Sequence, residues 1–168
     1  MRTLSVKGRV YPTDLNHNGG VFGGWIMGKM DKAASIAVDE IIKSGAVTVS
    51  VTDLHFKEPV SNGDIFYIYT EILHIGRSSI LIHVDFKIRQ IDKENQLSEL
   101  KSVVDAKFKF VAVENKKTVA ICDVLRPDAT EDVIAMAYMG KHIKDRAKAR
   151  AEKEDEELAN KITPQNIK

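Results

Sequence analysis

An aspartate inside an apolar stretch is the residue whose setting most suggests chemistry. Asp31 lies in segment 22–43, which contains no proline and whose apolar residues cover most of the circumference of a helix. A buried carboxylate is rarely kept without a partner, and desolvation makes it a stronger base. The alternative is that Asp31 lies on one hydrated stripe of the helix and pairs with Lys32 or a more distant lysine. The pattern alone leaves both interpretations open.

A glycine-rich loop immediately precedes this segment. Five of the ten glycines lie between Gly19 and Gly28. The loop leads into a helix N-terminus, where free backbone N–H groups can hold a carbonyl oxygen or an oxyanion. Phosphate is a second candidate, although the chain has neither a Walker lysine pattern nor a G-x-G-x-x-G after a strand. The plain alternative is a tight turn before a helix.

The remaining reactive side chains carry weaker signals. Cys122 is the only cysteine, which excludes an intrachain disulfide and fits a reducing compartment. No serine lies in a nucleophile elbow, and Trp25 and Phe22 at helical spacing are typical of core residues rather than of ligand platforms. The histidines lack metal-ligand spacing, so no metal site is predicted. They are His17, His55, His74, His83 and His142.

The elements that position these residues follow a simple order. A short strand is expected first, then one long apolar helix ended by Gly45, then four strands, then a charged helical tail. Short connections between the four strands favour antiparallel pairing, so the predicted fold is an α+β sheet around one helix. The ranges are Val6–Tyr11, Phe22–Lys43, Ala46–Glu58, Asp64–Ile75, Ser79–Ile91 and Leu100–Val113.

The chain is expected to form one domain, residues 1–125, followed by a charged helical tail, residues 126–168. In the tail, Arg150/Glu154 and Lys153/Glu157 are spaced one helical turn apart, which favours a solvated helix.

The predicted sheet also indicates an oligomer. Segment 65–69 is apolar at every position, so both faces of its strand are apolar. One helix covers only one face of a sheet, and the second face is therefore expected to pack on another subunit.

Charge and hydropathy exclude several classes of partner. The net charge of +1 gives no general electrostatic case for binding nucleic acid or a membrane surface. The chain start lacks the apolar run of a signal peptide, and no stretch approaches the roughly 20 apolar residues that span a bilayer. The expected location is the cytoplasm.

Residues 14–27, from Asp14 to Met27, followed by Met30 and Asp31, resemble the signature of hotdog-fold acyl-CoA thioesterases. The nearest branch is that of the YciA-like bacterial enzymes, which are related to mammalian cytosolic acyl-CoA hydrolases. The resemblance extends over residues 1 to about 115 through ordered landmarks, while the tail is not covered. These landmarks are segments 47–51, 56–60, 76–80 and 108–113.

The resemblance implies hydrolysis of an acyl-CoA thioester to a free acid and CoA. It implies that Asp31 is catalytic, as a general base or as a nucleophile that forms an anhydride. Asn16 would orient the carbonyl or the water, and the N–H of Gly24 would stabilise the oxyanion. The facing subunits of a dimer, often assembled into a hexamer, would share each site. No cofactor beyond the CoA of the substrate is expected.

Residues near the loop and in a distant turn are expected to bind substrate. Phe22 and Gly23 flank the expected carbonyl site. In segment 77–79, Arg77, Ser78 and Ser79 would hold the phosphates of CoA, with a plain polar turn between strands as the alternative. Close YciA-like relatives often have Asp or Asn where this chain has Gly20, which bears on substrate range.

Two other functions stay open at this point. One is a hotdog protein that binds acyl-CoA without hydrolysing it. The other is a hotdog dehydratase, which is expected to use a loop histidine, here His17, with an acidic residue on the helix.

Overall fold

The computed structural model describes residues 2–162, with side chains described to residue 155. It contains two α-helices, six strands and two short 3₁₀ turns. In chain order they are β1 (Arg2–Arg9), η1 (Pro12–Asp14), α1 (Gly23–Asp39), β2 (Gly45–Phe56), β3 (Ile65–Ile75), β4 (Ser79–Arg89), β5 (Lys101–Glu114), β6 (Lys117–Thr118), η2 (Ile121–Asp123) and α2 (Glu131–Ile162).

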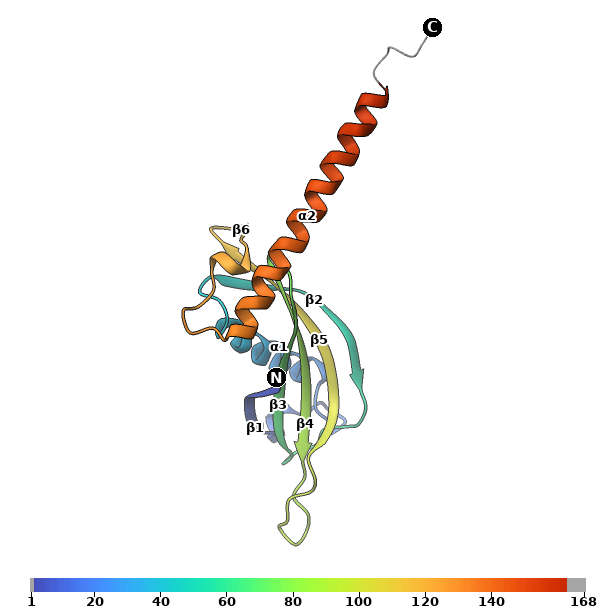
Figure 1. Cartoon of the computed structure of the whole chain (residues 1–168). Coiled ribbons are helices and arrows are strands. Elements are labelled where there is room, and N and C mark those ends of the chain that lie inside the picture. The colour runs from blue at the N-terminus through green and yellow to red at the C-terminus, as the bar shows by residue number, and fades with distance from the viewer. Residues whose placement is uncertain (1, 163–168) are drawn as a thin grey trace.

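One antiparallel sheet curves around α1, as predicted (Figure 1). The strand order is β1-β3-β4-β5-β2, and the short β6 pairs with β5. β1 and β2 are therefore the two edges of the main sheet. The first strand begins at Arg2 rather than at the predicted Val6, because Arg2 to Arg9 pair with β3.

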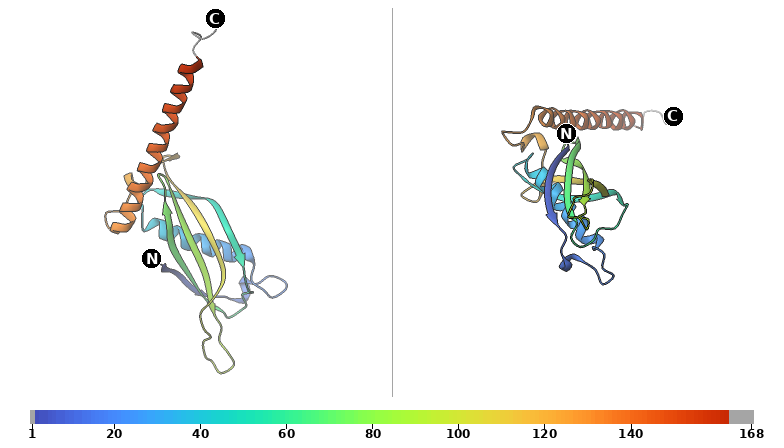
Figure 2. Two further views of the ribbon diagram at one scale, coloured as in Figure 1. Left: turned by 45° about the vertical axis from the view of Figure 1, so that its right-hand side comes forward. Right: turned by 90° about the horizontal axis from the view of Figure 1, so that it is seen from below.

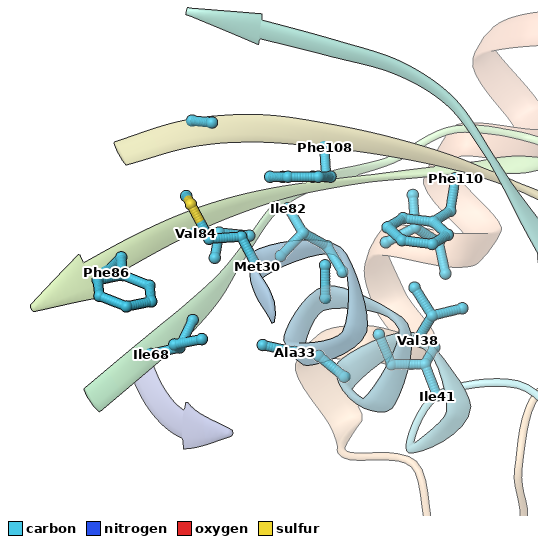
Figure 3. Packing of buried hydrophobic residues seen from close by; sticks show 14 of the residues in the cluster. Met30, Ala33, Val38, Ile41, Ile68, Ile82, Val84, Phe86, Phe108 and Phe110 are labelled. Atoms are coloured by element: carbon cyan, nitrogen blue, oxygen red, sulfur yellow. The ribbon is translucent and has the colours of Figure 1, made fainter. Parts of the chain in front are cut away.

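The core lies between α1 and the facing side of the sheet (Figure 3). Met30 and Ala33 of α1 meet Ile82, Phe86 and Phe108, all of them fully buried. Burying a side chain of this size stabilises the fold by about 1.5–3 kcal/mol. The alternation predicted for the third long strand is confirmed, since its apolar residues lie on this inner face.

In the single chain α1 is buried on one side only, although apolar residues cover most of its circumference. Its buried residues follow helical spacing and face the sheet. They are Ile26, Met30, Ala33, Ala34, Ala37 and Val38. The opposite stripe, with Gly24, Gly28 and Lys32, is exposed in the single chain.

α1 also ends earlier than the predicted Lys43, at Asp39. The backbone beyond it bonds to the segment after η2 instead of continuing the helix. Lys43 N–H donates to the Val124 carbonyl at 2.8 Å, and Arg126 N–H donates to the Ile41 carbonyl at 2.9 Å. Tertiary contacts with residues 81 and 85 positions away therefore set the end of α1, and Gly45 begins β2.

The outer face of the sheet is more polar than the sequence suggested. Tyr67 and Tyr69 lie on it, and the ammonium groups of Lys7 and Lys87 lie over their rings at 5.1 and 5.6 Å. Exposed apolar side chains occur on the edge strand β2, at Val47, Val49 and Phe56, and also at Leu4 of β1 and Leu73 of β3. The outer face at residues 65–69 is polar in part, because the tyrosines combine with charged neighbours.

The long helix α2 has two parts. Val133 and Ala137 in its first turns are buried with the domain, whereas residues 142–155 are exposed and the helix projects beyond the sheet (Figure 2). Arg150 Nε donates to Glu154 at 2.8 Å as expected, while the side chain of Glu157 lies outside the described part. Neither helix in residues 2–162 is apolar enough over sufficient length to cross a bilayer. The division at residue 125 stays a prediction.

Candidate active site

The N-terminus of α1 presents two free backbone donors. Phe22 precedes the helix in an extended conformation and supplies no side-chain cap. Trp25 and Ile26 donate to the Phe22 carbonyl at 3.0 and 3.2 Å, which leaves the N–H groups of Gly23 and Gly24 without an acceptor in residues 2–162. Gly24 is exposed, and a Cβ at this position would meet nothing within 4 Å, so the space beside its Cα is open. This geometry suits an incoming carbonyl oxygen.

Asp31 lies on the partly exposed side of α1 and faces β2. Thr48 Oγ1 donates to Asp31 Oδ1 at 2.7 Å. The carboxylate is therefore fixed in direction, while its second oxygen stays available. Neither Lys32 nor another lysine pairs with Asp31 in the described residues, so the ion-pair alternative is not what the structure shows.

Asn16 organises the loop that precedes α1. Its Oδ1 accepts from the N–H groups of Asn18 at 2.9 Å and Gly20 at 3.2 Å. Gly19 adopts φ +81°, a conformation that favours glycine. The Asn16 Nδ2 group lies 3.7 Å from where a Cβ of residue 20 would be. A side chain at position 20 would thus contact Asn16.

Two aromatic side chains flank the helix start. Phe22 is 55% exposed, so it is not the core residue that its helical spacing suggested, and Phe56 at the end of β2 is 50% exposed. The Phe56 ring lies so close to α1 that a Cβ at Gly23 would be 3.2 Å from its Cζ. Gly23 therefore permits this contact, and the two rings offer an apolar surface beside the free N–H groups.

The single chain does not bring all the predicted catalytic groups together. Asp31 follows Gly24 by seven residues, which places it about 10 Å further along the helix axis. Asn16 and Asp31 share no hydrogen bond in the described residues, and Asn16 Oδ1 accepts only within its own loop. A carbonyl held by Gly24 is out of contact with Asp31 of the same chain.

The turn with Arg77, Ser78 and Ser79 lies at the other end of the sheet. Ser79 is paired through Val111 with Val47, whereas Phe56 lies beside Gly23. Nine residues of strand separate Val47 from Phe56, or about 30 Å. The predicted phosphate-binding turn and the predicted carbonyl site are therefore far apart in one chain.

Sequence reasoning missed Thr48 and Phe56, which contact the site from β2. Their pairing with α1 depends on the register of β2 against β5, and this register contains two irregularities. A pattern of alternating residues does not reveal where such irregularities fall.

The charged groups of the neighbouring sheet are largely paired. The Lys107 ammonium, 2.7 Å from Asp53, lowers the pKa of that carboxyl. Lys57 bonds to Asp105 and holds its pKa below the usual range. In residues 2–162 no group of three or more His, Cys, Asp or Glu side chains could hold a metal ion.

Comparison with known proteins identifies the family of this chain. Residues 18–94 match the model of the thioesterase superfamily. An uncharacterized acyl-CoA thioester hydrolase of Haemophilus influenzae is 42% identical over 68% of this chain and 71% of its own. The acyl-CoA thioester hydrolase YciA of Escherichia coli is 33% identical over 68% of this chain and 82% of its own.

A solved structure extends the similarity to three dimensions. It is the aspartate-to-alanine mutant of a hexameric broad specificity acyl-coenzyme A thioesterase, 34% identical, with a TM-score of 0.69. The alignment covers 83% of this chain and 97% of that one. The predicted hotdog fold and the resemblance in residues 14–31 are both confirmed. The chain belongs to the thioesterase superfamily, in the group of the acyl-CoA thioester hydrolases.

Proposed function

We propose that this protein hydrolyses acyl-CoA thioesters to a free carboxylic acid and CoA. One observation carries the proposal: the exposed stripe of α1 holds two free backbone donors, at Gly23 and Gly24, and a directed carboxylate, Asp31. Donors of this kind stabilise the oxyanion of acyl transfer, and a carboxylate activates the attacking group.

The thioester carbonyl oxygen would accept from the N–H of Gly24. The Asn16 amide would orient the carbonyl or the attacking water. Asp31 would remove a proton from water as it attacks, or would itself attack to form an anhydride that water then hydrolyses. Both routes release CoA thiol and a carboxylic acid, and both use the same three residues.

The reaction is proposed to require two copies of the chain. Asp31 lies about 10 Å further along the axis of α1 than Gly24, which is too far to reach a carbonyl bound at Gly24 of the same chain. Two antiparallel copies of α1 across a dyad would place each Asp31 beside the other chain's helix start. The edge strand β2, with exposed Val47 and Val49, is a suitable contact surface for this pairing. Assembly into a hexamer, as in the solved relative, is proposed as well.

The same dyad accounts for the distant turn. The Phe56 end of β2 in one copy would lie near the Gly45 end of β2 in the other. The partner's turn at Arg77, Ser78 and Ser79 would then be at the same end as the first copy's Gly24. Arg77 is proposed to bind CoA phosphate groups, with the two serines as hydrogen-bond donors.

A thiol-release assay over a panel of acyl-CoAs of different chain length tests the proposal. We expect thiol release from at least one of them. Binding of acyl-CoA with no thiol release would instead support a non-hydrolytic binding protein. Reversible hydration of an enoyl-CoA would instead support a dehydratase. The feature that favours a dehydratase is the exposed His17 in the loop.

The cytoplasm stays the predicted compartment, supported by the single cysteine. The absence of a cofactor also stays a prediction.

A further inference from the structure

A cavity of about 340 Å³ lies where the β3–β4 turn, β5 and α2 meet. The turn and β5 form one wall, and α2 forms the other. Its lining contains four basic side chains, two serines and an apolar group, and no acidic residue. The basic residues are His74, Arg77, Lys109 and Lys144; the serines are Ser78 and Ser79; the large apolar residues are Leu81 and Ile143.

The position of α2 against the turn is fixed by close packing. A Cβ at Gly140 would lie 2.3 Å from the Ile75 carbonyl oxygen, so only glycine permits this approach. On the other side of the turn, Ile121 N–H donates to the Arg77 carbonyl at 2.7 Å. Close packing therefore holds the segment of α2 that carries Lys144 against the turn, although α2 projects into solvent one turn later.

The cations of this cavity lack partners within the chain. Arg77, Lys109 and Lys144 form no ion pair in the described residues, whereas Lys148, one turn further along α2, pairs with Glu152 at 3.6 Å. The chain as a whole carries a net charge of only +1. Three unpaired cations around one cavity are thus a local feature, and mutual repulsion is relieved when an anion binds.

We propose that α2 completes the binding site for the phosphorylated adenosine end of CoA, with Lys144 and Lys109 holding phosphate groups opposite Arg77. This inference rests on the proposed function. Lysine ammonium groups bind phosphate as point charges, and the apolar side chains of Leu81 and Ile143 offer a surface for a purine ring. Both lysines lie outside the residues 18–94 that match the family model.

Steady-state kinetics and equilibrium binding of CoA test this inference on the full-length protein. For Lys144→Ala and Lys109→Ala we expect the KM for acyl-CoA and the Kd for CoA to rise about tenfold, as when one hydrogen bond between charged groups is lost. The kcat is expected to stay unchanged. Lys148→Ala is the matched control on the same helix and should leave both constants unchanged, while Lys144→Arg should preserve binding.

Two further probes identify which part of the ligand is held. Adenosine 3′,5′-bisphosphate should compete with CoA, and Lys144→Ala should weaken its binding. An acyl-pantetheine substrate, which lacks the nucleotide, should be hydrolysed equally by the wild type and by Lys144→Ala. A site for a free nucleotide unrelated to catalysis would instead bind the bisphosphate without competition from CoA, which would overturn the proposal.

The outcomes separate this inference from the proposed function. CoA binding that depends on Lys144, without thiol release, would overturn the hydrolase and leave this site standing. Thiol release with an unchanged KM and Kd in both Lys144→Ala and Lys109→Ala would overturn this site alone. Equal weakening by Lys144→Ala and Lys148→Ala would also overturn it, because general electrostatics would then account for the effect.

Discussion

The two ends of the sheet differ in what their charged groups are free to do. At the helix-start end, Lys57 is bonded to Asp105 at 2.7 Å, and Lys101 is paired with Glu58. At the turn end, Arg77, Lys109 and Lys144 form no ion pair in the described residues, whereas Lys141 is paired with Asp123 at 3.4 Å. The first end offers backbone donors and aromatic rings, and the second offers unpaired cations. One end therefore suits a thioester, and the other suits phosphate.

The largest effect is expected from removing the carboxylate at the helix-start side. Asp31→Asn keeps the shape and the hydrogen bond from Thr48 but removes the base. We expect kcat to fall by about 100- to 10,000-fold, the usual contribution of a general base. Thiol release measures this, and elution volume must show an unchanged oligomer. Near-normal turnover in a correctly assembled Asp31→Asn protein would contradict the assignment.

Mixing two inactive variants tests whether a second copy joins the two ends. Asn16→Ala and Asp31→Ala subunits, refolded together at equal amounts, form mixed dimers in which one of two sites receives both wild-type residues. Random pairing then predicts recovery of about a quarter of wild-type activity. If verified mixed dimers recover nothing, the site lies within one chain and the arrangement proposed for α1 is wrong.

At the turn end we expect a smaller effect, and we expect it on KM rather than on kcat. Arg77→Ala should raise the KM for acyl-CoA by about 10- to 100-fold through loss of a charge-assisted hydrogen bond, with little change in kcat. The contrast with Asp31→Asn lies in which constant changes. A large fall in kcat with acyl-CoA at saturation would show that the two ends are not separate in function.

Thr48 is expected to have a modest role in directing Asp31. Thr48→Val removes the 2.7 Å hydrogen bond at constant size. We expect kcat to fall by about 3- to 10-fold, since one hydrogen bond contributes about 1 kcal/mol. Thr48→Ser should restore most of the rate, and its failure to do so would mean that packing rather than the hydroxyl matters.

Much of the fold could be predicted from the sequence because local patterns agreed with one another. The alternation in 80–88 identified the inner face, and the glycines before Trp25 located a helix start. The ends of elements were less accessible. α1 stops at Asp39 because Ile41 and Lys43 bond to residues 124–126, a contact with no local signal.

The residues of the site could be predicted more fully than their arrangement in space. Asn16 came from resemblance, whereas Asp31 and the glycine-rich helix start were also candidates from their own setting, and all of them stay proposals. A site shared between facing subunits was expected as well, whereas the closing of the Asn16 loop on itself through Gly20 could not be foreseen. The cavity at Arg77 required the approach of Gly140 to the β3–β4 turn, which brings together residues 64 positions apart.

The smallest expected effect concerns the paired cation Lys57 and is one of stability. Its ammonium, 2.7 Å from Asp105 Oδ1, lowers the pKa of that carboxyl below the unfolded value of about 3.9. The pair therefore stabilises the fold above that pH, and the contribution is lost as the pH falls through the lower folded pKa. Because Lys57 is half exposed, Lys57→Gln should reduce the free energy of unfolding at pH 7 by less than about 1 kcal/mol.

Urea unfolding of wild type and Lys57→Gln at pH 7 and in acid measures this, with the difference expected to shrink in acid. The variant should bind CoA as the wild type does, since the Lys57 ammonium is already paired with Asp105. A rise in the Kd for CoA as large as that of Arg77→Ala would contradict the contrast between the two ends. It would show that a cation already paired with a carboxylate still contributes to phosphate binding.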